Sequence, residues 1–97
     1  MKKKSYYVYI LTNYTKTVLY IGITNNLTRR LDEHKKGLVK SFSKQYKIKY
    51  LVYFEETNDV KEAITREKQL KRWNRTWKNQ LITQLNPKWE DLSKEWY

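Results

Sequence analysis

Two short runs of apolar and aromatic residues stand near the start of the chain. The first extends over Tyr6–Leu11 and the second over Val18–Gly22, with the polar segment 13–17 between them. Apolar runs of this length bounded by turn residues are typical of β-strands, and a short polar connection is typical of a hairpin. The pattern therefore predicts a β-hairpin in which each strand carries a tyrosine, Tyr9 in the first and Tyr20 in the second.

Helical spacing follows the hairpin. A first helix is predicted from a cap at Asn25 or Asn26 to about Lys36, with Gly37 well placed to end it. A polar, basic stretch runs through Tyr46, and a strand is predicted after it over 49–55. A second helix is predicted from Asn58 or Asp59 to about Trp73, and a third over 75–85 that stops before Asn86-Pro87. A last helical turn is predicted within 89–96, packed against the rest of the protein by its tryptophans. The order β-β-α-β-α-α predicts an α+β fold with a small three-stranded, mixed or antiparallel sheet flanked by helices.

Arg30 and His34 lie four residues apart in the first predicted helix, so both fall on one face. They border the apolar stripe that contains Leu27 and Leu31. Two phenols, a guanidinium and an imidazole in one short stretch suit a polar site for phosphate chemistry. Taken singly, Arg30 also fits a stem packed along the stripe with its charge in water, and His34 fits a boundary residue of the core.

Glu67 lies in the middle of the apolar stripe predicted for the second helix, which is formed by Val60, Ala63, Ile64 and Leu70. A carboxylate on a core-facing stripe is costly unless it is paired, hydrogen-bonded or bound to a metal. Two interpretations follow: a metal ligand, which we favour, and a buried ion pair with a nearby Arg or Lys.

Basic side chains cluster from the end of the second helix into the third, and we call this set the basic ridge: Lys68, Lys71, Arg72, Arg75 and Lys78. Such side chains need only face solvent to attract a phosphate backbone. Trp73 and Trp77 are interleaved with them, and tryptophan in a basic groove can stack on bases. Four-residue spacing on a helix favours a core position for Trp77, however. Asn79 is expected to point into solvent, away from the third helix's inner face.

Composition adds one strong signal, a net charge of +11 on 97 residues. This excess predicts a polyanionic partner, of which nucleic acid is the commonest, while an anionic membrane surface or an acidic protein is the rival. The length and a hydrophobic content of 39% predict one domain over 1–97. The absence of cysteine is consistent with a reducing, cytoplasmic location. Nothing approaches the roughly 18 apolar residues of a membrane span, and the short run after Lys2-Lys3-Lys4 lacks the cleavage site of a signal peptide.

In these residues the chain resembles the GIY-YIG nuclease superfamily, specifically its small single-domain bacterial members, and through them the N-terminal nuclease domain of the excision-repair nuclease C subunit. The resemblance begins with the tripeptides Tyr7-Val8-Tyr9 and Tyr20-Ile21-Gly22. It continues through Thr28-Arg29-Arg30, Glu33-His34, Leu51-Val52-Tyr53, Arg66-Glu67-Lys68, Trp77-Lys78 and Asn86-Pro87-Lys88-Trp89. In the first tripeptide Tyr7 and Val8 replace the family's glycine and isoleucine, whereas Tyr9 is kept.

The resemblance implies a metal-dependent endonuclease that hydrolyses DNA phosphodiester bonds, in DNA repair or processing, with Mg²⁺ or Mn²⁺ as its cofactor. It implies that Tyr9 is the general base, that Tyr20 and His34 orient the water or the phosphate, and that Arg30 binds the non-bridging oxygens. It implies that Glu67 holds the metal and that Gly22 allows close backbone passage where strand meets helix. Asn79 would be the asparagine that follows the catalytic glutamate. His34 could exchange the base role with Tyr9.

Two other functions remain open from the sequence. One is a non-catalytic nucleic-acid-binding module on the same fold, which would have no need of Glu67. The other is a protein-interaction domain that uses the Trp-rich C-terminal surface, and it predicts little salt dependence of nucleic-acid binding. The sequence also leaves open DNA versus RNA, the oligomeric state, and a partner protein that supplies specificity.

Overall fold

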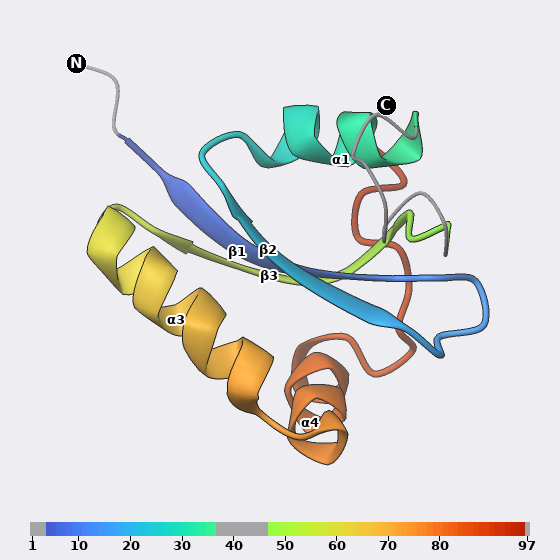
Figure 1. Ribbon diagram of the computed structural model, residues 1–97. Helices are drawn as coiled ribbons and strands as arrows, with labels where there is room; N and C mark the ends of the chain where they lie inside the picture. The colour runs from blue at the N-terminus through green and yellow to red at the C-terminus, as the bar shows by residue number, and fades with distance from the viewer. Residues whose placement is uncertain (1–3, 37–46, 97) are drawn as a thin grey trace.

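The computed structural model describes residues 4–36 and 47–96 (Figure 1). The elements in this part of the chain are β1 (Tyr6–Thr12), β2 (Leu19–Thr24), α1 (Leu27–Lys35), β3 (Tyr50–Thr57), α3 (Val60–Arg72) and α4 (Arg75–Leu85). The predicted order and the α+β class are therefore confirmed, and all strand pairs are antiparallel. The predicted role of Gly37 and the stretch through Tyr46 lie outside the described residues.

The central strand of the sheet is β1, because the strand order is β2-β1-β3. Successive side chains of a strand point to opposite faces. Val8 and Ile10 accordingly join one apolar cluster with Ala63 and Leu70 of α3, whereas Tyr9 lies in a second cluster against α1. Figure 1 shows the two helices on opposite faces, α1 above the sheet and α3 below it. The sheet thus separates two small cores.

Each helix begins at a polar residue whose side chain accepts a backbone N–H from the first turn, which stabilises a helix start. Asn26 accepts from the amide of Arg29 at 3.1 Å, and Asp59 accepts from the amide of Lys61 at 2.8 Å. The sequence allowed a neighbouring residue as cap in both cases, and the structure selects Asn26 and Asp59. No helix of residues 4–36 and 47–96 is long and apolar enough to cross a bilayer.

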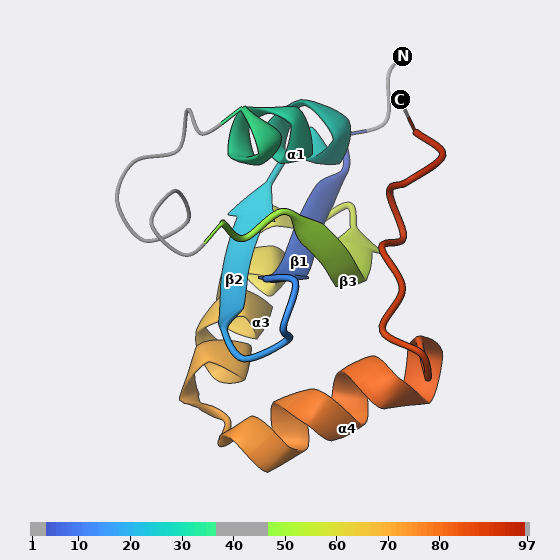
Figure 2. The same cartoon turned by 90° about the vertical axis from the view of Figure 1, so that its right-hand side faces the viewer.

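The predicted helical turn after α4 is wrong, since 86–96 forms a series of turns. Trp89 has φ 53°, a left-handed conformation that a right-handed helix cannot contain. The segment instead pairs with the outer edge of β3: the amide of Leu92 donates to the carbonyl of Leu51 at 2.8 Å, and Leu51 donates to Asp91 at 3.2 Å. Figure 2 shows this segment running beside β3. The expected tryptophan packing is present, because Trp96 lies edge-on to Phe54.

The predicted apolar stripes are buried only along their centres. Ala63 and Leu70 of α3 and Ile82 of α4 are fully buried, as expected. Val60 and Ile64 are each 41% exposed, Leu85 is 68% exposed, and Trp77 is 53% exposed, so the core position predicted for Trp77 is wrong. A three-stranded sheet offers a narrow apolar surface. A helix lying on it therefore covers the middle of its stripe and leaves the flanks in water.

Candidate active site

The phenol of Tyr9 is fully buried and is held between two side chains of α1. Its oxygen lies 3.3 Å from Nε2 of His34 and accepts a hydrogen bond from Nε of Arg30, also at 3.3 Å. Tyr20 of β2 adds a second phenol, with its ring centroid 5.1 Å from that of His34 and 6.3 Å from that of Tyr9. The structure therefore brings together four of the predicted site residues, from β1, β2 and α1.

Gly22 provides the space for the Tyr9 ring. The two residues are partners in the β1–β2 ladder, so the ring lies directly across β2 at this point. A Cβ atom on Gly22 would lie 2.5 Å from Cζ and 3.0 Å from Cε1 of Tyr9. Real Cβ atoms do not approach other atoms so closely, so an alanine would displace the ring. The sequence leads us to expect close passage of the backbone at Gly22, and the structure shows that the close neighbour of this backbone is the Tyr9 side chain.

Burial sets the protonation of this cluster. It raises the pKa of Tyr9 to about 12, an effect partly offset by the hydrogen bond from Arg30. Burial, and to a smaller extent the positive charge of Arg30, lower the pKa of His34 to about 4. Both groups are therefore neutral at pH 7. Arg30 donates to the Tyr9 oxygen, whereas the donor between Tyr9 and His34 depends on the imidazole tautomer: with the proton on Nδ1, the Tyr9 hydroxyl donates to Nε2 of His34.

Glu67 lies on α3, across the sheet from this cluster. Its side chain is 16% exposed and forms an ion pair with Lys71, at 3.2 Å between Oε2 and Nζ. The next residue back, Arg66, bonds to Glu55 of β3. Consecutive helix residues lie about 100° apart, so Glu67 occupies the other flank of α3, toward the edge strand β2. The ion-pair interpretation of Glu67 is therefore present in the structure, although its partner is an exposed lysine.

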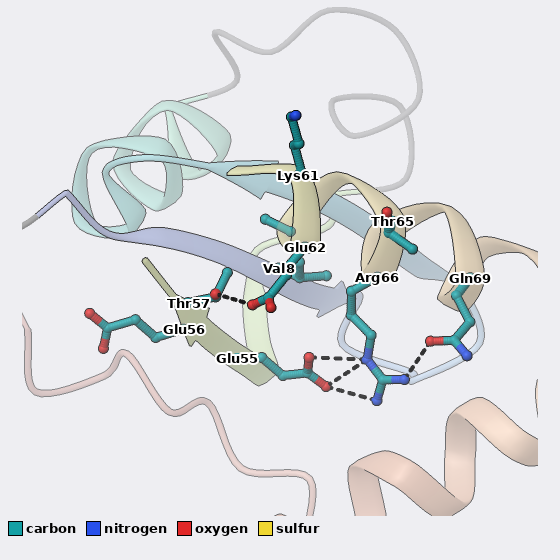
Figure 3. Close-up of a pocket in the computed structure, with 10 residues that line it drawn as sticks. Val8, Glu55, Glu56, Thr57, Lys61, Glu62, Thr65, Arg66 and Gln69 are labelled. Atoms are coloured by element: carbon teal, nitrogen blue, oxygen red, sulfur yellow. Dashed lines mark hydrogen bonds and ion pairs between the residues drawn. The ribbon is translucent and has the colours of Figure 1, made fainter. Parts of the chain in front are cut away.

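A hollow of about 470 Å³ lies on the β3 side of α3 (Figure 3). Three glutamates line it, Glu55, Glu56 and Glu62. Arg66 binds Glu55 with Nε–Oε1 of 3.0 Å and Nη2–Oε2 of 2.9 Å, and Thr57 donates to Glu62 at 3.0 Å. Lys61 and Arg66 line the same hollow, so three carboxylates lie beside two cations.

The basic ridge is divided by its contacts. Lys68, Lys71 and Arg72 are exposed, and Nζ of Lys78 lies 3.5 Å from the carbonyl of Lys71. Arg75 differs from these residues, because its guanidinium is bonded to backbone carbonyls of the β1–β2 turn. The charge pattern alone could not distinguish it from its neighbours.

Arg75 fastens the β1–β2 turn to α4. Its guanidinium donates to the carbonyls of Lys16 at 2.8 Å and Thr17 at 3.0 Å, and its Nε donates to Oδ1 of Asn79 at 2.8 Å. Asn79 is half-buried, rather than directed freely into solvent as expected, and it orients Arg75. These contacts join residues nearly 60 positions apart in sequence, a separation of 59 between Arg75 and Lys16.

Comparison with known proteins tests the resemblance to the GIY-YIG superfamily. The family model of the GIY-YIG catalytic domain matches residues 5–80. The chain belongs to the GIY-YIG family. This GIY-YIG protein is 38% identical over 89 residues to UPF0213 protein CPE1444 of Clostridium perfringens (strain 13 / Type A), covering 92% of this chain and 95% of that protein.

Two further relatives are similar to this chain over most of its length. A UPF0213 protein of Syntrophus aciditrophicus (strain SB) is 40% identical over 82 residues, which cover 84% of this chain and 92% of that protein. The solution NMR structure of the UPF0213 protein BH0048 from Bacillus halodurans is 26% identical, with a TM-score of 0.59, and the match covers 94% of this chain and 96% of that one. The match to a small GIY-YIG protein extends over nearly the whole chain.

We predict that Gly22→Ala destabilises the protein by about 1–3 kcal/mol, because its Cβ overlaps the Tyr9 ring. The same change in a Tyr9→Val background should cost less than about 1 kcal/mol, since the overlapping atoms are gone. Urea unfolding of the four proteins measures this double-mutant cycle. Equal costs in the two backgrounds would show that Gly22 serves another purpose.

We predict that His34 titrates near pH 4. The sequence contains one histidine, so its imidazole C–H signals in proton NMR are unambiguous. Because the unfolded chain takes up this proton near pH 6.5 and the folded protein only near pH 4, the free energy of unfolding should fall as pH drops through that window, by at most about 1.4 kcal/mol per pH unit. His34→Gln, which does not titrate, should have a shallower slope. A midpoint near 6.5 would refute the buried neutral imidazole.

Proposed function

We propose that this GIY-YIG protein is a metal-dependent endonuclease that hydrolyses DNA phosphodiester bonds in DNA repair or processing. The observation that carries the proposal is the hydrogen-bonded series from Arg30 through the Tyr9 phenol to His34. A buried phenol between a permanent cation and a neutral base is more elaborate than a packed core requires. It is suited to moving a proton beside a phosphate group.

The proton route follows from the protonation states. Tyr9 has a pKa of about 12, so a preformed phenolate is scarce at neutral pH. We therefore propose a relay: the Tyr9 oxygen takes a proton from the attacking water while its own proton passes to Nε2 of His34, 3.3 Å away. The phenol remains neutral overall. This arrangement uses both residues, where the sequence offered either one as the base.

Arg30 and Tyr20 fit the roles of phosphate ligands. Arg30 uses Nε for Tyr9 and places Nη1 3.5 Å from Glu33, while about a third of its side chain is exposed. Its fork-shaped cation can hold two phosphate oxygens at once. Tyr20 flanks His34 on the same side of the sheet and can orient the water or the phosphate.

A metal ion would be held by Glu67. No group of three or more His, Asp or Glu side chains arranged for metal binding exists among residues 4–36 and 47–96. One carboxylate with waters and substrate phosphate is, however, a common way to bind Mg²⁺, and it also suits Mn²⁺. The donor set fits, because the partner of Glu67 is a lysine 55% exposed that can turn toward phosphate instead. When bound, the ion would supply charge for the phosphate and acidify its water.

The basic ridge would guide the nucleic acid to this site. Lys71 pairs with Glu67, Nζ of Lys78 lies 3.5 Å from the carbonyl of Lys71, and Lys68 and Arg72 are exposed on the same helix as Glu67. Together with the net charge of +11, they favour a phosphate backbone approaching from this side. A partner protein or a second copy of the chain could add sequence specificity.

One observation favours a second function, a non-catalytic nucleic-acid-binding module. The Glu67–Lys71 ion pair satisfies the carboxylate without any metal. The two functions differ in cleavage, so the first test is incubation with linear, nicked and branched DNA and with RNA, in Mg²⁺ or in EDTA. Binding without cleavage of any substrate would favour the module.

We predict that Glu67→Gln lowers metal-dependent cleavage at least about 100-fold while the melting temperature changes little. The reason is that it removes the proposed metal ligand and, in stability terms, only an ion pair with an exposed lysine, worth at most about 1 kcal/mol. Glu62→Gln on the same helix is the matched control and should retain cleavage. Cleavage by Glu67→Gln at the wild-type rate would exclude the metal-ligand role.

We predict that Arg30→Lys slows turnover about 100-fold although the net charge is unchanged. An ammonium acts as a point charge and cannot bond to Tyr9 and to two phosphate oxygens together. The neighbouring exposed Arg29 provides the control, because Arg29→Lys should cleave normally. Single-turnover rates of the two variants test this. Similar rates for both would mean that Arg30 contributes charge alone.

A further inference from the structure

Three adjoining hollows surround the β1–β2 turn, on the part of the fold where α4 and the segment 86–89 meet the hairpin. Their volumes are about 310, 360 and 260 Å³. The first two share Tyr14 and Tyr50, and the second and third share Lys16 and Trp89. We call this continuous region the turn groove, lined chiefly by Tyr14, Lys16, Lys49, Tyr50, Lys88 and Trp89. None of these six residues belongs to the candidate active site.

Aromatic rings line the groove from three separate segments. Tyr14 in the turn is 82% exposed, and its ring centroid lies 6.4 Å from that of Tyr50 at the start of β3. Trp89 is half-buried, with its Nε1 bonded to Thr83 at 2.9 Å. A phenol so fully in water contributes little to a core. It is well placed to stack on a flat ligand.

The charge of the groove is of one sign. Lysines or an arginine line each of the three hollows, and no Asp or Glu lines any of them. The hollow beside β3 in Figure 3 differs, because three glutamates line it together with Lys61 and Arg66. Exposed aromatic rings among cations are the features with which proteins bind single-stranded nucleic acid, through stacked bases and a neutralised backbone.

The backbone of the groove is held in an uncommon conformation. The non-glycine residues with positive φ in the described part of the chain are Lys16 at 60°, Lys47 at 54° and Trp89 at 53°, and all three line the groove. Such conformations are uncommon for side chains with a Cβ and concentrate at functional sites. The Arg75 clamp on the turn keeps one wall fixed. A preformed groove loses less entropy when a ligand binds.

The groove adjoins the strand pair that carries Tyr20 of the candidate active site. Tyr20 of β2 pairs with Leu11 of β1, and Tyr14 lies three residues beyond Leu11, in the turn that follows the end of β1 at Thr12. We propose that the turn groove binds an unpaired segment of the nucleic acid, stacking a base on Tyr14, while the adjoining phosphates occupy the active site. Resting on the proposed function, this makes the substrate class a flap, gap, branch or single strand. The bases of a continuous duplex are paired and cannot reach Tyr14.

The test is binding in EDTA, where no metal-dependent cleavage occurs, of labelled single-stranded DNA, RNA of the same sequence, and the matching DNA duplex. Tyr14→Ala should weaken single-strand binding about 10-fold or more and change duplex binding less than 2-fold. Tyr14→Trp should bind at least as well as wild type. Trp77→Ala, which removes another exposed aromatic beside the basic ridge, is the matched control and should have little effect. Equal melting temperatures of the variants verify folding.

Three results would overturn the proposal. The first is an equal loss of single-strand and duplex affinity in Tyr14→Ala. The second is a loss of affinity in Trp77→Ala as large as that in Tyr14→Ala. The third is a loss of affinity in the Lys16→Gln, Lys49→Gln double variant but none in Tyr14→Ala, which would indicate a site for any polyanion, including an acidic protein. The DNA and RNA arms identify the strand that is preferred. Single-strand binding through Tyr14 without cleavage of any substrate would refute the nuclease and leave the groove supported.

Discussion

The site depends on burying one hydroxyl. Tyr9 is on the central strand and is fully enclosed, and a buried hydroxyl without a partner would cost about 1–3 kcal/mol. Its partners, Arg30 and His34, both come from α1. When α1 packs on the sheet, it therefore also brings together the side chains of the site. The glycine at position 22 belongs to the same constraint, because any larger residue would occupy the space of the phenol.

The sheet divides the remaining chemistry by face and by edge. Alternation along β1 and β2 directs the phenols toward α1, whereas Glu67 lies on α3 at the flank near the edge strand β2. At the opposite edge, β3 is paired with the segment around Leu92 and borders the hollow with three glutamates. The hollow beside β3 thus combines three carboxylates with two cations, whereas Lys68, Lys71 and Arg72 are exposed on α3. On the proposed function, this uneven distribution of charge would favour one orientation of a polyanion.

Local signals in the sequence predicted the elements and part of the site, and failed where distant segments decide. The hairpin followed from two apolar runs, and the shared face of Arg30 and His34 followed from four-residue spacing. The exposure of Trp77 could not be read from its periodicity, because a stripe does not reveal how much of it a narrow sheet can cover. The binding of Arg75 to carbonyls of the β1–β2 turn depends on a contact across the whole fold, and so does the fit of the Tyr9 ring over Gly22.

Two cations, Arg30 and Lys71, influence the charge of neighbouring site residues, and a bound phosphate would weaken that influence. The charge of Arg30 is one reason why His34 has a low pKa, so an anion bound by Arg30 would offset that effect and make the imidazole a stronger base. Lys71 neutralises Glu67, and a phosphate that drew Lys71 away would free the carboxylate for a cation. Because α1 and α3 lie on opposite faces of the sheet, these changes would need two phosphates of the same strand, one at Arg30 and another at Lys71. On the proposed function, the substrate itself would thus activate the base and the metal ligand together, and the protein without nucleic acid would be a poor metal binder.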